Sequence, residues 1–201
     1  MRKITIITPS RIHFALLDLN GSLGRVDGGI GLSLAHPGFR INAQDSDEME
    51  IIAPPEIMPR ANTILSLLKD RCDIGNARLE IEENIPSHVG LGSGTQLSLG
   101  IAQAICSLYD LGLTHQEMAF SVERGGTSGI GVAAFSQGGF IVDGGHEFSK
   151  LFCEGKKNSF LPSSASKGIK PPPIIARYDF PDWDILITIP NCKHISGNEE
   201  V

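Results

Sequence analysis

The chain lacks long apolar runs, an excess of positive charge and a high content of aromatic residues. No stretch approaches the roughly 20 apolar residues that a membrane-spanning helix needs, and nothing at the N-terminus resembles a signal peptide. Of the 201 residues, 6% are aromatic, and the formal net charge is −6. Proteins that bind nucleic acids or membrane surfaces broadly need a basic face. The sequence therefore argues against both classes, and we expect a cytoplasmic protein.

Closely spaced cysteines are also absent. The four cysteines, at positions 72, 106, 153 and 192, stand far apart and include no CxxC pair. This spacing suits neither a zinc site nor a disulfide framework, so we expect reduced thiols. The chain does have 41% apolar and 20% charged residues, which is typical of a globular protein with a substantial core. Its length allows one large domain, or one domain and a fragment of another.

Short β-type runs fill the first half and are separated by glycine, proline, asparagine and aspartate. These runs are Ile4–Thr8, Ile12–Leu19, Ile30–Leu34, Phe39–Ala43 and Glu48–Ala53, with turns expected at Asn20-Gly21 and Asp27-Gly28-Gly29. Helices are expected at Pro59–Cys72, at Thr95–Tyr109 and from Thr114, where Thr114 and Glu117 suit a capping box. Later strand-like runs are Arg78–Glu83, Gly139–Asp143 and Ile185–Ile189, and Leu161–Pro173 is expected to be a surface loop. This order predicts a mixed α+β fold. The pair Phe180 and Trp183 is expected to lie in the core.

The sharpest local feature is a glycine-rich loop, Pro86–Thr95, that runs directly into an apolar helical pattern. Glycine lets the backbone approach a ligand closely, and the start of a helix presents unpaired N–H groups and a positive dipole end. A tight strand-to-helix turn explains the glycine spacing equally well. The loop is neither a Walker A loop nor a Rossmann fingerprint. The residues expected to bind phosphate are Gly90, Gly92, Ser93, Gly94 and Thr95.

Two further clusters flank this loop: Pro9–Phe14 followed by Asp18, and Gly126–Ile130 followed by Gly138-Gly139. In order and spacing, the three clusters resemble the motifs of the GHMP kinase superfamily, which includes galactokinase, homoserine kinase and mevalonate kinase. The resemblance implies an α+β GHMP kinase N-terminal domain, of the ribosomal protein S5 domain 2-like fold, over residues 1–190. Residues 191–201 would then begin a truncated C-terminal domain, the rest of that ferredoxin-like domain being missing.

Two positions depart from the kinase pattern. The kinases typically carry GLGSSA in the loop, and the second serine is Gly94 here; their later SGID motif ends here in Gly131. A kinase needs a group that orients or deprotonates the acceptor hydroxyl, and losing such a carboxylate usually costs orders of magnitude in rate. An ATP-dependent small-molecule kinase therefore remains only an alternative, with a carboxylate from elsewhere replacing the missing aspartate. The same fold also occurs in RNA-contacting proteins, but the acidic composition disfavours that function.

Several long strings resemble the beta-ribofuranosylaminobenzene 5'-phosphate synthase family. They are Arg11–Phe14 with Leu16–Leu19, Gly24–Leu32, Gly90–Gln96 and Glu123–Gly131. The resemblance implies decarboxylating transfer of a phosphoribosyl group from phosphoribosyl diphosphate to 4-hydroxybenzoate, or to 4-aminobenzoate. The products would be a C-riboside 5'-phosphate, diphosphate and CO2, in methanopterin biosynthesis. It also implies Mg²⁺ as cofactor, and a homodimer is one candidate assembly.

This reaction suggests roles for individual residues. Acidic side chains would stabilise positive charge on the ribose or hold magnesium, and the candidates are Asp18, Asp27 and Glu123. Candidate groups for the phosphates or the benzoate are Arg11, His13, Arg25, Thr127, Ser128 and Gly129, while the metal ligands stay unassigned. Simpler explanations exist for each: exposed arginines, a half-buried histidine instead of a proton carrier, a turn at Asp27, a solvated ion pair at Glu123, and loop-shaping hydroxyls.

Overall fold

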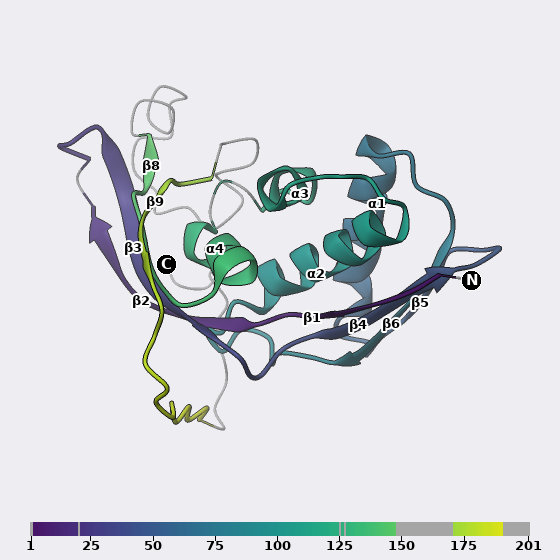
Figure 1. Cartoon of the computed structure of the whole chain (residues 1–201), viewed down its shortest axis with the longest axis horizontal. Coiled ribbons are helices and arrows are strands. Elements are labelled where there is room, and N and C mark those ends of the chain that lie inside the picture. Colours follow the sequence, from purple (N-terminus) through teal and green to yellow (C-terminus); the bar gives the residue numbers. More distant parts are fainter. Residues whose placement is uncertain (1, 20, 125, 127, 148–170, 191–201) are drawn as a thin grey trace.

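The computed structural model describes residues 2–19, 21–124, 126, 128–147 and 171–190. Within these ranges the strands form two sheets, with helices packed against one side of them (Figure 1). The first sheet has the order β1 (Lys3–Ile7), β4 (Arg40–Asp45), β6 (Ala77–Glu83) and β5 (Glu50–Ile52). The second has the order β2 (Ser10–Asp18), β3 (Arg25–Leu34), β7 (Phe140–Asp143) and β9 (Ile174–Tyr178), and β8 (His146–Glu147) also pairs with β3.

The helices are α1 (Met58–Arg71), α2 (Ser93–Leu108), α3 (His115–Ser121) and α4 (Gly129–Gln137). Helix α2 is apolar on nearly all sides, and such a helix has to be buried. It packs against β1 and β4, while α4 packs against β2, β3 and β7 (Figure 1). The buried side chain of Gln96 joins the two helices, because its Nε2 donates to the carbonyl of Gly131 at 2.9 Å.

The main core lies between α2 and the first sheet. Its largest fully buried side chains include Phe39, Ile41, Leu79, Leu99 and Ile101. Burying a side chain of this size stabilises the folded state by about 1.5–3 kcal/mol. The core therefore fixes the position of α2, and with it the position of the glycine loop at the start of that helix.

Most predicted elements are confirmed. Each strand and helix predicted before residue 144 has a counterpart in the structure. The bounds lie close to the predicted ones except at β3, which begins five residues before the predicted Ile30, and α4, β8 and β9 had not been predicted. The capping box is also confirmed, since Glu117 N–H donates to Thr114 Oγ1 at 3.2 Å and Thr114 N–H donates to Glu117 Oε2 at 2.8 Å. Asn20 and most of the 161–173 loop lie outside the described residues.

Three predictions were wrong. Asp27-Gly28-Gly29 is not a turn but lies inside β3, where Asp27 and Gly28 have φ values of 69° and 66°. No strand forms at Ile185–Ile189, because a strand needs a partner and none of the described strands pairs with this segment. Phe180 and Trp183 are not in the core. Their rings meet edge to face with the ring centroids 5.7 Å apart, and the two residues are 37% and 70% exposed.

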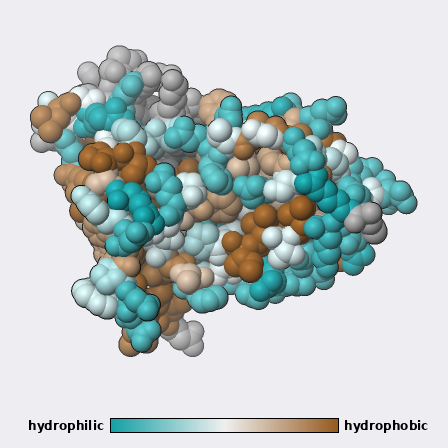
Figure 2. Space-filling model, in the orientation of Figure 1, coloured by the Kyte–Doolittle hydropathy of each residue, from teal (hydrophilic) through white to brown (hydrophobic). Residues whose placement is uncertain are grey.

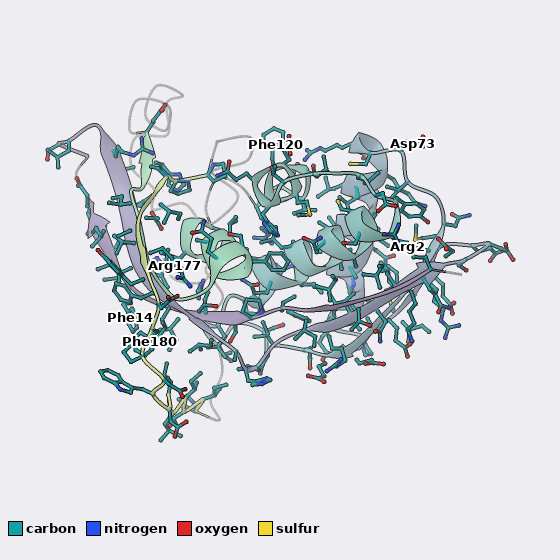
Figure 3. The ribbon with its side chains drawn as sticks, in the orientation of Figure 1. Arg2, Phe14, Asp73, Phe120, Arg177 and Phe180 are labelled. Atoms are coloured by element: carbon teal, nitrogen blue, oxygen red, sulfur yellow. The ribbon has the colours of Figure 1, made fainter. Side chains whose placement is uncertain are left out.

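Apolar groups gather at the end of the molecule that carries β2, β3 and β9 (Figure 2). Strand β2 is the edge of its sheet, and its exposed apolar side chains are Phe14, Leu16 and Leu17. Phe14 points away from the helices (Figure 3). Within the described part of the chain, no helix is long and apolar enough to cross a membrane.

Candidate functional site

The glycine loop between β6 and α2 is fastened to strand β2. Gly90 and Gly92 have φ values of 81° and 78°, a left-handed backbone that suits glycine. The backbone N–H of Arg11 donates to the carbonyl of Leu91 at 3.1 Å, and its guanidinium donates to the carbonyl of Gly90. Burial lowers the pKa of the Arg11 guanidinium. The loop therefore lies beside a partly desolvated cation.

The first turn of α2 presents backbone N–H groups next to this loop. Gly92 is the N-cap residue, and its carbonyl accepts hydrogen bonds from the N–H groups of Thr95 and Gln96, each at 3.1 Å. Ser93 and Gly94 come before these bonds, at positions where helical N–H groups have no intrahelical partner. The positive end of the helix dipole lies here as well. Such an end favours a bound anion.

Two arginines that the sequence analysis missed converge on this end of α2. A Cβ on Gly94 would stand 2.6 Å from Nη1 of Arg60, which comes from α1, and 3.5 Å from Nη2 of Arg124, which follows α3. Among the described residues, neither guanidinium has a hydrogen bond or an ion pair. Burial lowers the pKa of Arg124, and the charge of Arg60 lowers it further, while Glu123 offsets part of this effect. Two neighbouring cations of this kind are stabilised by an anion between them.

The second glycine cluster meets the first one through two hydroxyl groups. Ser128, the N-cap of α4, places its Oγ 2.9 Å from Oγ1 of Thr95 in α2. The two predicted loops are therefore brought together, with Gly129 opening α4 beside them. Thr127 lies outside the described residues.

A buried carboxylate and a histidine lie on the other side of Gly129. Asp143, at the end of β7, is 5% exposed. Its Oδ2 stands 2.8 Å from the position of a Cβ on Gly129 and 3.0 Å from that of a Cβ on Gly29. His13 Nε2 stands 2.6 Å from the same Gly29 position. Side chains at 29 and 129 would collide with these groups, so glycine at both positions leaves room for them.

The charges in this cluster affect one another. Burial raises the pKa of Asp143, while the N–H of Gly145, donating to Oδ1 at 3.0 Å, and the two nearby histidines oppose the rise. Burial lowers the pKa of His13, with Arg11 adding to the effect and Asp143 opposing it. Burial also lowers the pKa of His146, whose buried Nδ1 has no hydrogen-bond partner in the part of the chain that the structure describes. Asp143 and His146 are the second set of residues that the sequence analysis missed.

The remaining predicted residues have partners of their own. Arg25 donates to the carbonyls of the turn after β7, with Nε 2.7 Å from Gly144 O and Nη2 2.6 Å from Gly145 O. Asp18 accepts from the N–H of Gly21 at 2.9 Å and lies opposite Asp27 in the β2–β3 register.

Glu123 follows α3 and pairs with Arg71 of α1 at 3.3 Å. Asp18 and Asp27 are therefore neighbours on adjacent strands, whereas Glu123 lies apart from them in an ion pair with α1. In the described ranges, no group of three histidine, cysteine or acidic side chains can hold a metal ion.

The chain is similar to known proteins in sequence and in fold. The model of the GHMP kinases N-terminal domain matches residues 60–139, which include the glycine loop and the start of α4. The Methanococcus jannaschii mevalonate kinase superposes with a TM-score of 0.52 at 15% identity, covering 70% of this chain and 53% of that one. Streptococcus pneumoniae phosphomevalonate kinase superposes with a TM-score of 0.55 at 15% identity, and the match covers 74% of this chain and 51% of that one. The chain therefore has the fold of the GHMP kinases N-terminal domain. Its predicted fold class is thereby confirmed.

More similar relatives are named beta-ribofuranosylphenol 5'-phosphate synthases. The Archaeoglobus fulgidus protein is 48% identical over 194 residues, which is 96% of this chain and 59% of the relative. The Methanocaldococcus jannaschii protein is 45% identical over 210 residues, which is 98% of this chain and 62% of the relative. The chain thus spans about three fifths of the length of these relatives. The division at residue 190 stays a prediction.

The two departures from the kinase pattern now have a structural setting. At Gly94, where the kinases have a second serine, the space beside the helix is taken by Arg60. At Gly131, the three nearest heavy atoms to an added Cβ belong to Thr95 and Ser128, the closest being Thr95 Cγ2 at 3.0 Å. An aspartate at 131 would therefore point toward the start of α2. Asp143 does not replace it, because residues 129 and 131 lie on opposite faces of α4.

Proposed function

We propose that the protein transfers the phosphoribosyl group of phosphoribosyl diphosphate to 4-hydroxybenzoate. The products would be a ribofuranosylphenol 5'-phosphate, diphosphate and CO2, as a step of methanopterin biosynthesis. The observation that carries the proposal is an end of α2 flanked by two guanidinium groups that have no hydrogen bond or ion pair to the described residues, in a chain whose homologues at 43–48% identity are named as synthases of this product. The word phenol in those names favours the hydroxyl acceptor over 4-aminobenzoate.

The anion-binding end of α2 suits the leaving diphosphate. As the bond between C1 and oxygen breaks, negative charge builds up on the diphosphate. Fixed N–H groups and guanidinium groups stabilise such charge without having to reorganise. The N–H groups of Ser93 and Gly94, together with Arg60 and Arg124, would serve this purpose. The hydroxyls of Thr95 and Ser128 lie close enough to one another to bind a single phosphate group.

The ribose carries the opposite charge. Asp18 and Asp27 lie across from each other on β2 and β3 and are our candidates for stabilising the oxocarbenium ion. Arg25 donates to backbone carbonyls through both Nε and Nη2. Arg11 also donates to a carbonyl, that of Gly90, but this bond holds it beside the anion site, so Arg11 is the better candidate for the 5'-phosphate or the benzoate carboxylate. Glu123 stays a candidate catalytic residue. Its charge would act on the neighbouring guanidinium of Arg124, and not directly on the ribose.

Magnesium is part of this proposal, but a site built only from protein ligands does not fit the residues present. The described ranges hold no suitable group of three ligands. Magnesium commonly keeps several waters and binds through substrate phosphates, so we expect it to enter with the donor diphosphate. A homodimer also remains a prediction, which light scattering of the purified protein will check.

The test is an assay of diphosphate release with the full-length protein. We expect release to require phosphoribosyl diphosphate, magnesium and 4-hydroxybenzoate together, and to stop when any one is omitted. The alternative kinase function predicts instead that ATP is converted to ADP with a small alcohol or acid, whether or not the benzoate is present. That result would contradict the proposal.

A further inference from the structure

We propose that His13 and Asp143 form the proton-transfer pair of this site. In this role His13 accepts the proton of the acceptor's para-hydroxyl group, and Asp143 stabilises the imidazolium ion that results. The inference rests on the proposed function, because it assigns the group that activates the phenol. It concerns residues that the anion-binding end of α2 does not include.

The geometry suits a histidine backed by an acid. His13 Nε2 and Asp143 Oδ2 both lie within 3.0 Å of one point, the position of a Cβ on Gly29. His13 is exposed on β2, so a substrate can reach it, whereas Asp143 is 5% exposed and lies behind it. A hydrogen bond from Gly145 N–H to Oδ1 holds the carboxylate and leaves Oδ2 facing Gly29. An exposed base with a buried acid behind it is the arrangement expected of a proton acceptor.

The pair borders the anion site on two sides. His13 and Arg11 lie on the same face of β2, because strand side chains alternate, and Arg11 is bonded to the glycine loop. On the other side, Gly129 contacts Asp143 and follows Ser128, whose hydroxyl meets Thr95 at the start of α2. A substrate whose diphosphate binds at α2 would therefore have its acceptor near His13.

The surrounding charges keep His13 available as a base. Arg11 on the same strand disfavours the protonated form, and Asp143 from β7 favours it. Asp27 on β3 and His146 on β8 face Asp143 in turn, and Arg25 faces His146. Burial, which has the largest effect, lowers the pKa of His13 below its ordinary value, and this favours the neutral imidazole that can take a proton.

The proposed step moves one proton to His13 and back. The phenol O–H bond breaks and its proton goes to the imidazole of His13, while the oxygen's electrons enter the ring. The ring carbon that bears the carboxylate bonds to C1 of the ribose, and the C1–O bond breaks with its electron pair leaving on the diphosphate. The bond to the carboxylate then breaks, CO2 departs and the electron pair restores the aromatic ring. The phenolate oxygen finally takes the proton back from His13.

The test combines His13→Gln with an acceptor that needs no base. We expect His13→Gln to lower kcat for 4-hydroxybenzoate about 100-fold or more, as loss of general base catalysis does, with little change in KM for phosphoribosyl diphosphate. 3,5-Difluoro-4-hydroxybenzoate has a more acidic hydroxyl that is ionised at the assay pH. With this acceptor, the rate of His13→Gln should come close to the rate of the unmodified protein with the same acceptor. The control His36→Gln, at an exposed histidine in the turn after β3, should behave like the unmodified protein.

Asp143→Asn provides a second readout that a purely structural role would not change. Removing this charge should move the titration of His13, followed by NMR, and the acid limb of the pH–rate profile to lower pH. The exposed control Asp70→Asn on α1 should move neither. Equal loss of rate with both benzoates in His13→Gln, or an unmoved His13 titration in Asp143→Asn, would overturn the inference. If the unmodified protein releases no diphosphate with any benzoate, the proposed function itself is wrong.

Discussion

The guanidinium groups of Arg60 and Arg124 meet over Gly94 at the first turn of α2, although 64 positions separate the two residues in the sequence. A Cβ at position 94 would stand 2.6 Å from the first and 3.5 Å from the second. Two cations and the positive end of a helix at one place repel each other unless an anion joins them. We therefore regard this pair as the clearest structural sign of a diphosphate site.

Replacing either arginine with alanine should weaken binding of the donor. A charge-assisted hydrogen bond contributes about 1.5–3 kcal/mol, so Arg60→Ala and Arg124→Ala should each raise KM for phosphoribosyl diphosphate about 10- to 100-fold. KM for the benzoate should change little. Arg78→Ala is the matched control, because Arg78 pairs with Glu50 on the first sheet, at 3.4 Å. An unchanged donor KM in both site variants would show that the pair has no part in binding.

Restoring the serine of the kinases at position 94 should damage the site without unfolding the protein. Gly94→Ser places a Cβ where Nη1 of Arg60 now lies, and a flexible arginine can move away. We expect the thermal midpoint to change by less than about 2 °C, since about 1 kcal/mol corresponds to roughly 2–4 °C in a domain of this size. Diphosphate release should fall as Arg60 is displaced. Full activity in Gly94→Ser would argue that the position of Arg60 is unimportant.

The glycine loop, the long helix after it and the strand-rich first half were predictable because their signals are local. Glycine spacing, capping residues and helical periodicity act within a few residues. Arg60 and Arg124 gave no local signal, since each looks like an ordinary helix or loop arginine. The one available sign was the glycine at position 94, which acquires its meaning only once α1 and the segment after α3 are in place.

Asp143 and His146 were overlooked for a similar reason. The run ending at Asp143 was correctly predicted as a strand, but only the pairing of β7 with β3 brings the carboxylate to Gly29 and His13. The signal that could have found it is a polar group at the end of an apolar strand, followed by two glycines and a histidine. The wrong strand at Ile185–Ile189 shows the reverse error, because alternation alone does not supply a pairing partner.

Asp143→Asn should stabilise the protein at neutral pH. The folded-state pKa of Asp143 is raised above its ordinary value of 3.8, so the folded state binds the proton more tightly than the unfolded state. The stabilisation of the folded state that comes from protonating Asp143 is complete at pH values below its ordinary pKa of 3.8. It is lost as the pH rises through the raised pKa of the folded state. Removing the buried charge should therefore raise the thermal midpoint at pH 7 by about 2 °C or more. The gain over the unmodified protein should shrink toward pH 4. A lower midpoint at pH 7 would contradict this sign.

Returning an aspartate to position 131 should not create a kinase. The Cβ of Gly131→Asp would stand 3.0 Å from Thr95 Cγ2, and overpacking of this kind typically costs about 1–3 kcal/mol. The new carboxylate would also lie near the start of α2 and repel the donor diphosphate. We expect a higher KM for phosphoribosyl diphosphate and no ADP from ATP with the acceptors tested. ADP formation by this variant would show that the kinase machinery is otherwise intact.

The central claim is that this GHMP kinase scaffold performs pentosyl transfer with loss of CO2. The most direct measurement supplies the full-length protein with phosphoribosyl diphosphate, magnesium and 4-hydroxybenzoate labelled in its carboxyl group. We expect labelled CO2 and diphosphate to appear in equal amounts, and ATP not to replace the donor. Diphosphate without labelled CO2, or turnover that depends on ATP and ignores the benzoate, would contradict this claim.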